Sequence, residues 1–294
     1  MKEALKRAAE AWLPPALLPP LRRMVTRLRN GGPEWAVLRG GWEAGDPQGE
    51  GWNHPSVVAA QLSRWPDFLA AVQGTGPLGI SHEARRIRQD NASAHNAILC
   101  FLHALSRAAL VAGGPVRVLD WGGGLGYYAA IARAALPELA LDYTVKETAP
   151  VCAAAAPLLP EVRFEAGAEA SLARRYDLVF ASNSIQYERD WPALLGRFAE
   201  AGAGGFVFLS RLPLARRAAD FVILQRPRWA GYDTEYRSWV FNHAGFLAAA
   251  QRAGLALERE FLMPDEPTRI PGAPEAVANG AFLFRARADG QPAV

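Results

Sequence analysis

Short apolar segments and helical segments alternate from residue 94 onward, and this alternation constrains the fold more than any other feature of the chain. It is typical of βαβ units, which build a mostly parallel sheet with helices on both faces. The last two expected strands follow one another without a helix, which suits an antiparallel addition to such a sheet. We therefore predict an α/β fold with a doubly wound, seven-stranded, mostly parallel sheet that ends in a C-terminal antiparallel strand. The expected strands are 116–121, 141–147, 162–166, 176–182, 204–210, 255–262 and 280–288.

The amino-terminal third of the chain is helical in pattern but interrupted by proline and glycine. Apolar positions recur at helical spacing over 57–72, which predicts a helix that ends near Gly74. We predict a helical N-terminal cap or lid over 1–93 and a second domain over 94–294. A polar and aromatic stretch at about 211–242 breaks the alternation and is predicted to be an insertion in that domain.

Composition limits which partners the protein is expected to bind and in which cellular compartment it is expected to lie. The net charge is only +3, so the sequence predicts no nucleic-acid partner. The two cysteines, Cys100 and Cys152, are too few for a disulfide framework and are not spaced as metal ligands. We therefore expect buried thiols in a cytoplasmic protein, and no metal site. No stretch reaches the roughly 18 uninterrupted apolar residues that a membrane span needs.

The first 30 residues combine basic side chains with an apolar stretch that four prolines interrupt. No small-residue cleavage pattern follows, which argues against a signal peptide. The basic residues could touch an anionic membrane surface, although the pattern is more typical of the solvated face of a packed helix. The sequence makes no prediction of the oligomeric state.

A glycine-rich turn follows the first predicted strand, in the segment "VLDWGGGLGYY" at 118–128. In Rossmann-like sheets this turn is the usual ligand cradle. A phosphate-binding P-loop would need lysine and serine or threonine after the last glycine, where Tyr127 and Tyr128 stand. A dinucleotide stays open, because one register of the glycines, ending at Ala129, satisfies the looser dinucleotide pattern. The glycines of the turn are Gly122, Gly123, Gly124 and Gly126.

Two acids flank this turn and narrow the choice of ligand. Asp120 lies at the end of the first strand, where a carboxylate would repel a pyrophosphate but attract the positively charged methionine end of S-adenosylmethionine. Glu147 ends the second strand, about 20 residues after the turn, where an acid can accept hydrogen bonds from both ribose hydroxyls. Glu147 supports a nucleoside of either kind, whereas Asp120 favours the cationic one.

These features together resemble the class I S-adenosylmethionine-dependent methyltransferases. The resemblance covers about residues 94–290 and is carried by "VLDWGGGLG", by Glu147 and by "YDLVFASNSIQYERDW". A narrower resemblance spans nearly the whole chain. It is to a family of bacterial methyltransferases often found with surface-polysaccharide or other secondary biosynthetic genes. Leu212 stands where that family more usually has a polar residue. The motifs of this narrower resemblance are, in order, "GWEA", "VLDWGGGLGYY", "SIQY", "LSRLPL", "ILQRP" and "YRSWVF".

The resemblance implies S-adenosylmethionine as cofactor and S-adenosylhomocysteine as product. The loop 122–126 would then wrap the methionine part of the cofactor, Asp120 would lie near its amino group, and Glu147 would hold its ribose. The segment that begins at Ala166 and runs to Glu169 would border the adenine. Methyl transfer from a sulfonium requires no metal, only alignment of the reactants and, for a hydroxyl acceptor, removal of a proton.

The residues after the fourth predicted strand should project toward the transferred methyl group. Among them we predict that Asn183 binds the cofactor, that Gln186 binds the substrate and that Tyr187 is catalytic. Ser184 belongs to the same segment. Either Asn183 or Ser184 could instead satisfy the last backbone groups of the strand.

Histidine is the usual general base near neutral pH. We predict His95 and His243 as catalytic residues. His54 and His82, in the cap region, could also face a substrate. His103 lies eight residues after His95, so these two could share one face of a helix.

The predicted insertion carries arginine and aromatic side chains that suit a planar, sugar-like or anionic acceptor. Trp239 is expected to anchor the insertion against the core. The predicted acceptor contacts are Arg211, Gln225, Tyr232 and Tyr236.

The leading prediction is therefore an S-adenosylmethionine-dependent methyltransferase that forms an O-methyl ether or ester on a small-molecule or saccharide acceptor. An N-methyltransferase is the nearest alternative. A nicotinamide-dependent reductase also stays open, as does a non-catalytic protein that binds the cofactor without transferring its methyl group.

Overall fold

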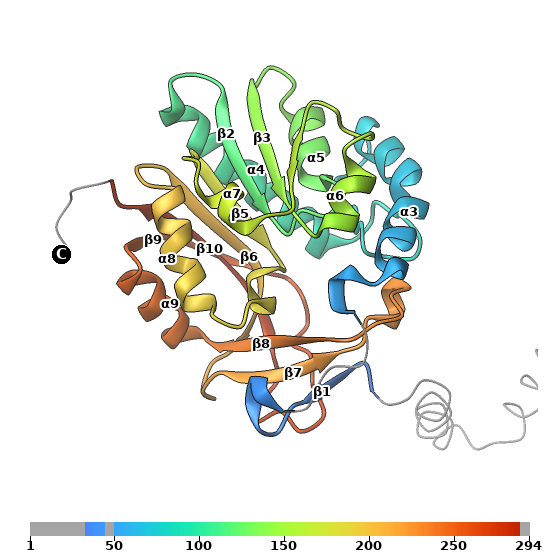
Figure 1. Cartoon of the computed structure of the whole chain (residues 1–294), viewed down its shortest axis with the longest axis vertical. Helices are drawn as coiled ribbons and strands as arrows, with labels where there is room; N and C mark the ends of the chain where they lie inside the picture. Colours follow the sequence, from blue (N-terminus) through green and yellow to red (C-terminus); the bar gives the residue numbers. More distant parts are fainter. Residues whose placement is uncertain (1–32, 45–49, 289–294) are drawn as a thin grey trace, which may run out of the picture.

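The computed structural model describes residues 33–44 and 50–288, and within them ten strands form one sheet (Figure 1). The strand order is β1-β7-β8-β6-β5-β2-β3-β4, and β10 pairs with both β6 and β9. The predicted α/β fold with its mostly parallel Rossmann-like sheet is confirmed. The strands are β1 (Trp35–Val37), β2 (Val116–Trp121), β3 (Leu141–Lys146), β4 (Arg163–Glu165), β5 (Leu178–Ser182), β6 (Phe206–Ala215), β7 (Phe221–Gln225), β8 (Tyr236–Asn242), β9 (Leu255–Leu262) and β10 (Ala278–Ala286).

All seven predicted strands form, as β2 to β6, β9 and β10. The strands β4, β3, β2, β5 and β6 pair in parallel, and β10 pairs antiparallel with β6 and β9. The carboxyl ends of the parallel strands therefore meet along one edge. Ligands of doubly wound sheets bind at this edge.

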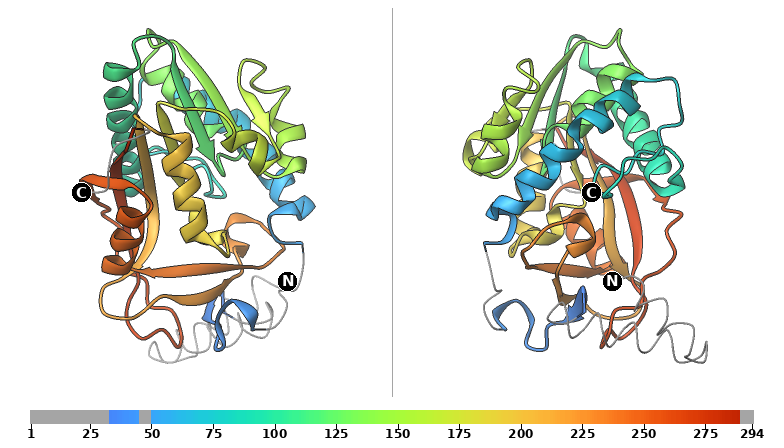
Figure 2. Two further views of the ribbon diagram at one scale, coloured as in Figure 1. Left: turned by 60° about the vertical axis from the view of Figure 1, so that its left-hand side comes forward. Right: turned by 90° about the vertical axis from the view of Figure 1, so that its right-hand side faces the viewer.

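The strands β1, β7 and β8 were not predicted, and they extend the sheet beyond the expected seven. The strand β6 continues past the predicted end at residue 210, and its last residues pair in parallel with β8. Pro213 lies within β6, and a proline in an apolar run normally indicates the end of a strand. The sequence pattern therefore suggested an insertion where the structure continues the sheet. Figure 2 shows the extension at the lower end of the molecule.

Helices cover both faces of the sheet. Their apolar side chains form two main cores, one under α3 to α6 and the other under α7 to α9. The α-helices are α3 (Pro55–Gln73), α4 (Ala92–Ala112), α5 (Tyr127–Ala135), α6 (Ala149–Ala155), α7 (Ala168–Leu172), α8 (Trp191–Ala201) and α9 (His243–Arg252), and the 3-10 helices are η2 (Gly41–Glu43), η3 (Gly51–Asn53), η4 (Ile185–Tyr187) and η5 (Arg228–Ala230).

The helix α4 is long and apolar enough to cross a membrane by length and composition alone. Ile98, Phe101 and Leu105 on one of its faces are buried in the core against the sheet. The side chain of Asn91 caps its first turn by accepting from the amide of Ala94 at 2.9 Å. The helix ends at Gly113 in the left-handed conformation. These features are those of a core helix in a globular domain.

The predicted helix at 57–72 is confirmed as α3, and Gly74 follows its last residue. Besides α3, the described residues before 93 form η2, η3 and the strand β1, so this region joins the sheet as well as covering it. The predictions for the first 30 residues, including a contact with membrane surfaces, lie outside the described residues.

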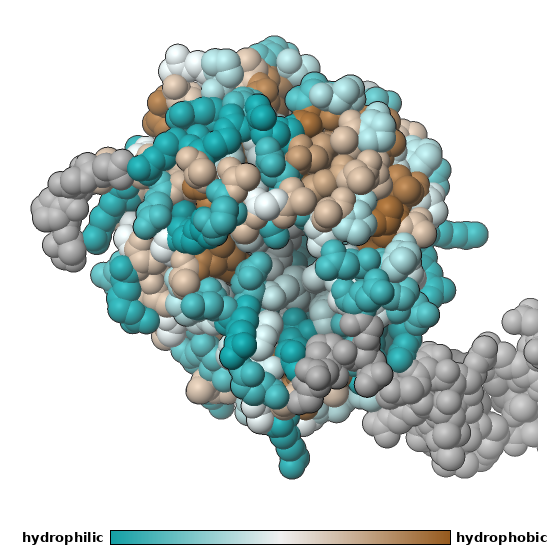
Figure 3. All heavy atoms as spheres, in the orientation of Figure 1, coloured by the Kyte–Doolittle hydropathy of each residue, from teal (hydrophilic) through white to brown (hydrophobic). Residues whose placement is uncertain are grey.

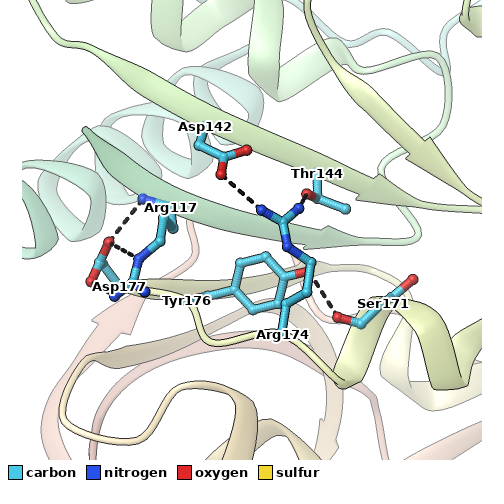
Figure 4. Close-up of polar contacts among 7 residues, drawn as sticks. All are labelled: Arg117, Asp142, Thr144, Ser171, Arg174, Tyr176 and Asp177. Carbon is cyan, nitrogen blue, oxygen red and sulfur yellow. Dashed lines mark hydrogen bonds and ion pairs between the residues drawn. The ribbon is translucent and has the colours of Figure 1, made fainter.

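Polar contacts connect the strands at the edge opposite their carboxyl ends (Figure 4). The Arg117 guanidinium forms a two-pronged ion pair with Asp177, whose nearest oxygen lies 2.8 Å away. Arg174 donates to Asp142 at 2.8 Å and to the Thr144 hydroxyl at 3.0 Å. These contacts fix the loop before β5 against β2 and β3. These contacts lie away from the carboxyl edge of the sheet.

Candidate active site

A cavity of about 950 Å³, its open mouth included, lies at the carboxyl ends of the parallel strands. Residues that follow β2, β3 and β5 line one side, and residues of η3, α3 and the loop after α3 line the other. The space-filling view shows the surface hollowed near the centre of this face (Figure 3). Pockets at this edge of a doubly wound sheet are the usual ligand sites of such folds.

The glycine turn forms the floor of the cavity, and the structure leaves no room for side chains there. Gly122 and Gly124 have φ angles of +75° and +59°, which other residues rarely adopt. A Cβ atom on Gly122 would lie 2.5 Å from the Cβ of Ser184, and one on Gly123 would lie 2.5 Å from the Cγ of Asp120. Gly126 caps the start of α5. The loop therefore exposes bare backbone to whatever the cavity holds.

Asp120 lies beneath this loop and is only 1% exposed. The hydroxyl of Tyr143 donates a hydrogen bond to its Oδ2 at 3.1 Å. The pKa of the Asp120 carboxyl is raised to about 8, mainly by burial; the tyrosine hydrogen bond opposes this rise, and the nearby Glu147 carboxyl adds to it. A buried acid in this state gains most from a cationic ligand, which would favour its charged form.

Glu147 stands at the end of β3, facing the glycine turn. Its Oε2 accepts from the Gly124 amide at 3.2 Å, and its Oε1 accepts from the Thr148 amide at 2.7 Å. Burial raises the pKa of this carboxyl, whereas the two amides and Lys146 lower it. The carboxylate is thus oriented by backbone donors and is available to accept from ligand hydroxyls.

Aromatic side chains form a wall of the cavity. Trp52 stacks on Tyr236 with ring centroids 4.3 Å apart and meets Tyr187 edge-on at 5.1 Å and Tyr232 edge-on at 6.0 Å. These four residues, which we call the aromatic wall, come from η3, η4 and the segment that leads into β8. Flat rings of this kind contact planar ligands and the apolar faces of sugars.

Three titratable side chains lie beside this wall: His82, Glu83 and Arg211. The His82 imidazole stacks on the Tyr127 ring at 4.3 Å, with 24° between the planes. Burial lowers the pKa of His82 to about 4; the charge of Glu83 raises it, and those of Arg211 and Arg64 lower it. His82 is therefore neutral near pH 7, with a nitrogen that can accept a proton.

Two buried polar atoms near the glycine turn have no hydrogen-bond partner within the described residues, the Gln61 Oε1 and the Tyr127 hydroxyl. Gln61 is 8% exposed and Tyr127 is 3% exposed. Both lie close to Gly124, because a Cβ there would come within 3.5 Å of the Gln61 oxygen and 3.1 Å of the Tyr127 ring. Unsatisfied buried polar groups are rare in folded proteins, so these two indicate a polar ligand at this point.

Arg64 connects the elements that surround the cavity. It is 5% exposed, and its guanidinium donates to backbone carbonyls of Ala60 at 2.7 Å, of Glu83, and of Ala230 at 3.0 Å. The first carbonyl belongs to α3, the second to the loop that carries His82, and the third to η5. Arg64 thus holds the helix and both loops in one arrangement.

Hydrogen bonds also hold the residues that follow β5 in place. Asn183 adopts a φ of +53°, and its side-chain oxygen accepts from the Gln186 Nε2 at 2.6 Å. The Ser184 hydroxyl donates to the Trp121 carbonyl at 2.6 Å. Asn183 and Ser184 line the cavity, whereas Gln186 is buried behind them and does not.

One protein-family model matches more than half of the chain in sequence. A family model described as a methyltransferase domain matches residues 85–260. The chain belongs to this methyltransferase family. The methyltransferase uses S-adenosylmethionine as its cofactor and releases S-adenosylhomocysteine. The glycine turn, Asp120 and Glu147 fit that cofactor. The turn offers backbone without side chains, and the two acids suit a positively charged nucleoside.

No curated protein is similar enough in sequence to count as a relative of the methyltransferase. Among solved structures, the N-terminal domain of EvdMO1 with S-adenosylhomocysteine bound is 17% identical, with a TM-score of 0.46, covering 76% of this chain and 97% of that one. An S-adenosylmethionine dependent methyltransferase from Mesorhizobium loti is 18% identical, with a TM-score of 0.45, covering 67% and 99%.

A third similar structure is the 1,6-didemethyltoxoflavin-N1-methyltransferase of Burkholderia thailandensis, which is 18% identical with a TM-score of 0.44, covering 82% of this chain and 94% of that one. None of the three reaches a TM-score of 0.5.

The structure brings most of the predicted site residues of the methyltransferase to one place. Asp120, the glycines 122–124 and Glu147 line the cavity together with Asn183, Tyr187, Arg211 and Tyr232. Tyr236 reaches the site through its stack on Trp52. The predicted cofactor and acceptor contacts therefore meet at the same edge of the sheet.

Other predicted residues lie elsewhere. His243 begins α9, far along the chain from the glycine turn, and lines a separate surface hollow. Its Nε2 lies 2.9 Å from a Glu260 oxygen. His95 in α4, Gln225 at the end of β7 and the exposed Ala166 do not line the cavity. The structure places His82 at the site instead. The sequence had suggested it only as a residue that could face a substrate.

Sequence reasoning did not identify Trp52, Gln61 or Glu83 as site residues. One signal was present for Gln61, because it lies on the apolar face of α3 with Val57 and Phe68, where a polar side chain needs a reason. Trp52 lies in the short 3-10 helix η3 and Glu83 in the loop after α3, and the approach of both to the glycine turn depends on tertiary packing. No local sequence pattern could have predicted this approach.

Proposed function

We propose that this methyltransferase transfers the methyl group to an oxygen of a small-molecule or saccharide acceptor held between the glycine turn and the aromatic wall. The observation that carries the proposal is that a single cavity joins these two surfaces and includes the neutral His82. When bound, S-adenosylmethionine supplies an electrophilic methyl group and departs as a neutral thioether.

In this proposal the glycine turn holds the methionine part of the cofactor through backbone groups, since side chains are excluded there. Asp120 lies where it would balance the positive charge of the cofactor. Glu147 would accept from the ribose hydroxyls, and the backbone amides on its two oxygens hold it in that orientation. Asn183 and Lys146 complete the lining near the cofactor.

His82 would remove the proton from the acceptor hydroxyl as the new bond to carbon forms. Its stack on Tyr127 fixes the plane of the imidazole, and its neutral state leaves a lone pair free. Gln61 and Tyr127 offer unsatisfied polar atoms to the same acceptor. Positioning and proton removal are the two tasks that methyl transfer to a hydroxyl asks of a protein.

A saccharide or planar acceptor is supported by the aromatic wall. The motifs that resemble those of methyltransferases from polysaccharide or secondary biosynthetic loci lie around the wall. Trp42 of "GWEA" stacks on Trp239 of "YRSWVF" with centroids 5.4 Å apart. Trp239 thus anchors the extension of the sheet, as expected.

We also propose a cytoplasmic location, supported by Cys100 and Cys152, which are buried free thiols.

The decisive experiment measures transfer of a labelled methyl group from S-adenosylmethionine to a panel of hydroxylated sugars, phenols and matched amines. We expect product from hydroxyl acceptors, with the added methyl located on oxygen by mass spectrometry and NMR. Methylation of the amines alone would favour the N-methyltransferase. Tight binding of S-adenosylhomocysteine without any product would favour a non-catalytic role.

A second prediction concerns Glu147. Replacement by glutamine should weaken the binding of S-adenosylhomocysteine about tenfold, or about 1.4 kcal/mol, because an amide accepts less strongly than a carboxylate. Isothermal titration calorimetry measures this directly. Glu138→Gln, at an exposed position, is the matched control and should leave the affinity unchanged. Equal affinities for both variants would contradict the proposed ribose contact.

A further inference from the structure

Arg211 occupies an unusual position in the sheet. Leu209 pairs with Phe282 and Leu212 with Gly280, so Ser210 and Arg211 together face the single residue Ala281 across the strand pair. Arg211 has a φ of +56°, a conformation that costs energy for any residue with a side chain. Bulges of this kind redirect a side chain and are frequent next to active sites.

The bulge directs Arg211 into the cavity, where it is half-buried. Within the described residues, its guanidinium has no hydrogen bond and no ion pair. Arg64, the other arginine close to the cavity, donates to several backbone carbonyls instead. A guanidinium has five donors, and a partly buried one without an acceptor lacks the interactions that normally offset its desolvation.

The charges around Arg211 are separated rather than paired. Glu83 lines the same cavity, yet the two groups do not form an ion pair among the described residues. Both charges act on the pKa of His82, where burial is the largest cause, Glu83 raises the pKa and Arg211 lowers it. Glu83 belongs to the loop after α3 and Arg211 to the bulge of β6, so the two charges reach the cavity from different elements.

We propose that the acceptor carries an oxyanion, a carboxylate or a phosphate, and that Arg211 binds it. This inference rests on the proposed function, because it names the acceptor class of the same site. The planar guanidinium can give two parallel hydrogen bonds to either group. The oxyanion then fixes one end of the acceptor at the bulge, and the aromatic wall contacts its ring.

The arrangement explains why the strained backbone at Arg211 would be kept. A glycine at this position would relieve the strain but would remove the cation. Lysine would keep the charge but lose the two-pronged geometry. The bulge, the unpaired guanidinium and the adjacent rings together form a site for an anionic ring compound, with His82 on the neighbouring side to receive the hydroxyl proton.

The test uses the full chain saturated with S-adenosylhomocysteine, and calorimetry with matched probes. The pairs are 4-hydroxybenzoate against 4-hydroxybenzamide, D-glucuronate against D-glucuronamide, and phenyl phosphate against phenol, which tests the phosphate form. We expect at least one anionic probe to bind tenfold or more tightly than its neutral partner. Preference for phenyl phosphate over both carboxylates would identify a phosphate as the oxyanion.

Arg211→Gln should abolish the preference for the anionic probes, and Arg211→Lys should keep part of it. Arg216→Gln, an exposed arginine after β6, is the matched control and should bind like the wild type. The inference is overturned if no anionic probe binds more tightly than its neutral partner, or if Arg211→Gln keeps the preference. Loss of S-adenosylhomocysteine binding in the wild type would instead contradict the proposed function.

Discussion

Replacing His82 with phenylalanine should lower the rate of methyl transfer by about 100-fold or more, the range expected for loss of a general base. Phenylalanine keeps a ring that can stack on Tyr127, so the wall of the cavity stays filled. The variant should therefore bind S-adenosylhomocysteine within about twofold of the wild-type affinity. Single-turnover transfer of a labelled methyl group, at saturating acceptor, measures the chemical step separately from binding.

The pH dependence of the same reaction distinguishes His82 from an ordinary histidine. Burial lowers its pKa to about 4, so the fraction of neutral imidazole changes little between pH 5.5 and 8. The wild-type rate should then show no loss attributable to histidine protonation near pH 6.5. Such a loss should appear only as the pH falls toward 4, because the imidazole is then protonated and can no longer accept the acceptor's proton.

Three further variants complete this test. His95→Phe and His243→Phe replace the histidines that the sequence alone favoured, and both should retain near wild-type rates because neither lines the cavity. His103→Phe, at an exposed position in α4, controls for the general effect of adding a phenylalanine. A large rate loss in His95→Phe or His243→Phe, with His82→Phe unaffected, would overturn the assignment of the base.

The contrast between these histidines shows what local patterns in a sequence can reveal. The glycine turn, Asp120 and Glu147 could be found because each follows a strand at a fixed offset, and strand ends in a parallel sheet meet at one edge. The position of His82 depends on how the loop after α3 folds back over the glycine turn. That loop is held by Arg64 through backbone carbonyls, which carry no sequence signal.

The extension of the sheet was missed for a related reason. Pro213 and the bulge at Arg211 interrupt the alternating pattern of β6, although the strand continues through both. The strand β1 has only three residues and pairs with β7 from more than 180 positions away. Short strands of this kind are defined by their partners rather than by their own residues.

Replacing Asp120 with asparagine should weaken the binding of S-adenosylmethionine by roughly thirtyfold at pH 9, or about 2 kcal/mol, because a buried charge partner of the cofactor is lost. The loss should be smaller at pH 6.5. At that pH the wild-type carboxyl is protonated, since its pKa is about 8, and must release a proton when it meets the cation. Calorimetry in two buffers of different ionisation enthalpy should detect this proton release in the wild type only.

The same substitution should stabilise the free protein. The folded-state pKa of Asp120, about 8, lies above the ordinary aspartate value of 3.8, so folding takes up a proton between these two pH values. By linkage, the free-energy cost of burying this group is absent below pH 3.8, grows as the pH rises, and is complete above pH 8. Asparagine stays neutral at every pH and can still accept from the Tyr143 hydroxyl.

Thermal unfolding of the free protein should therefore show a gain for Asp120→Asn that is larger at pH 9 than at pH 5. A gain of about 2 kcal/mol corresponds to an increase in Tm of roughly 4–8 °C for a domain of this size. Asp67→Asn, at an exposed position in α3, should change neither Tm nor affinity. A destabilised Asp120→Asn variant would show that the carboxylate supports the fold. A stabilised variant with weakened cofactor binding would instead show that the buried charge is retained for the cofactor, at a cost in stability.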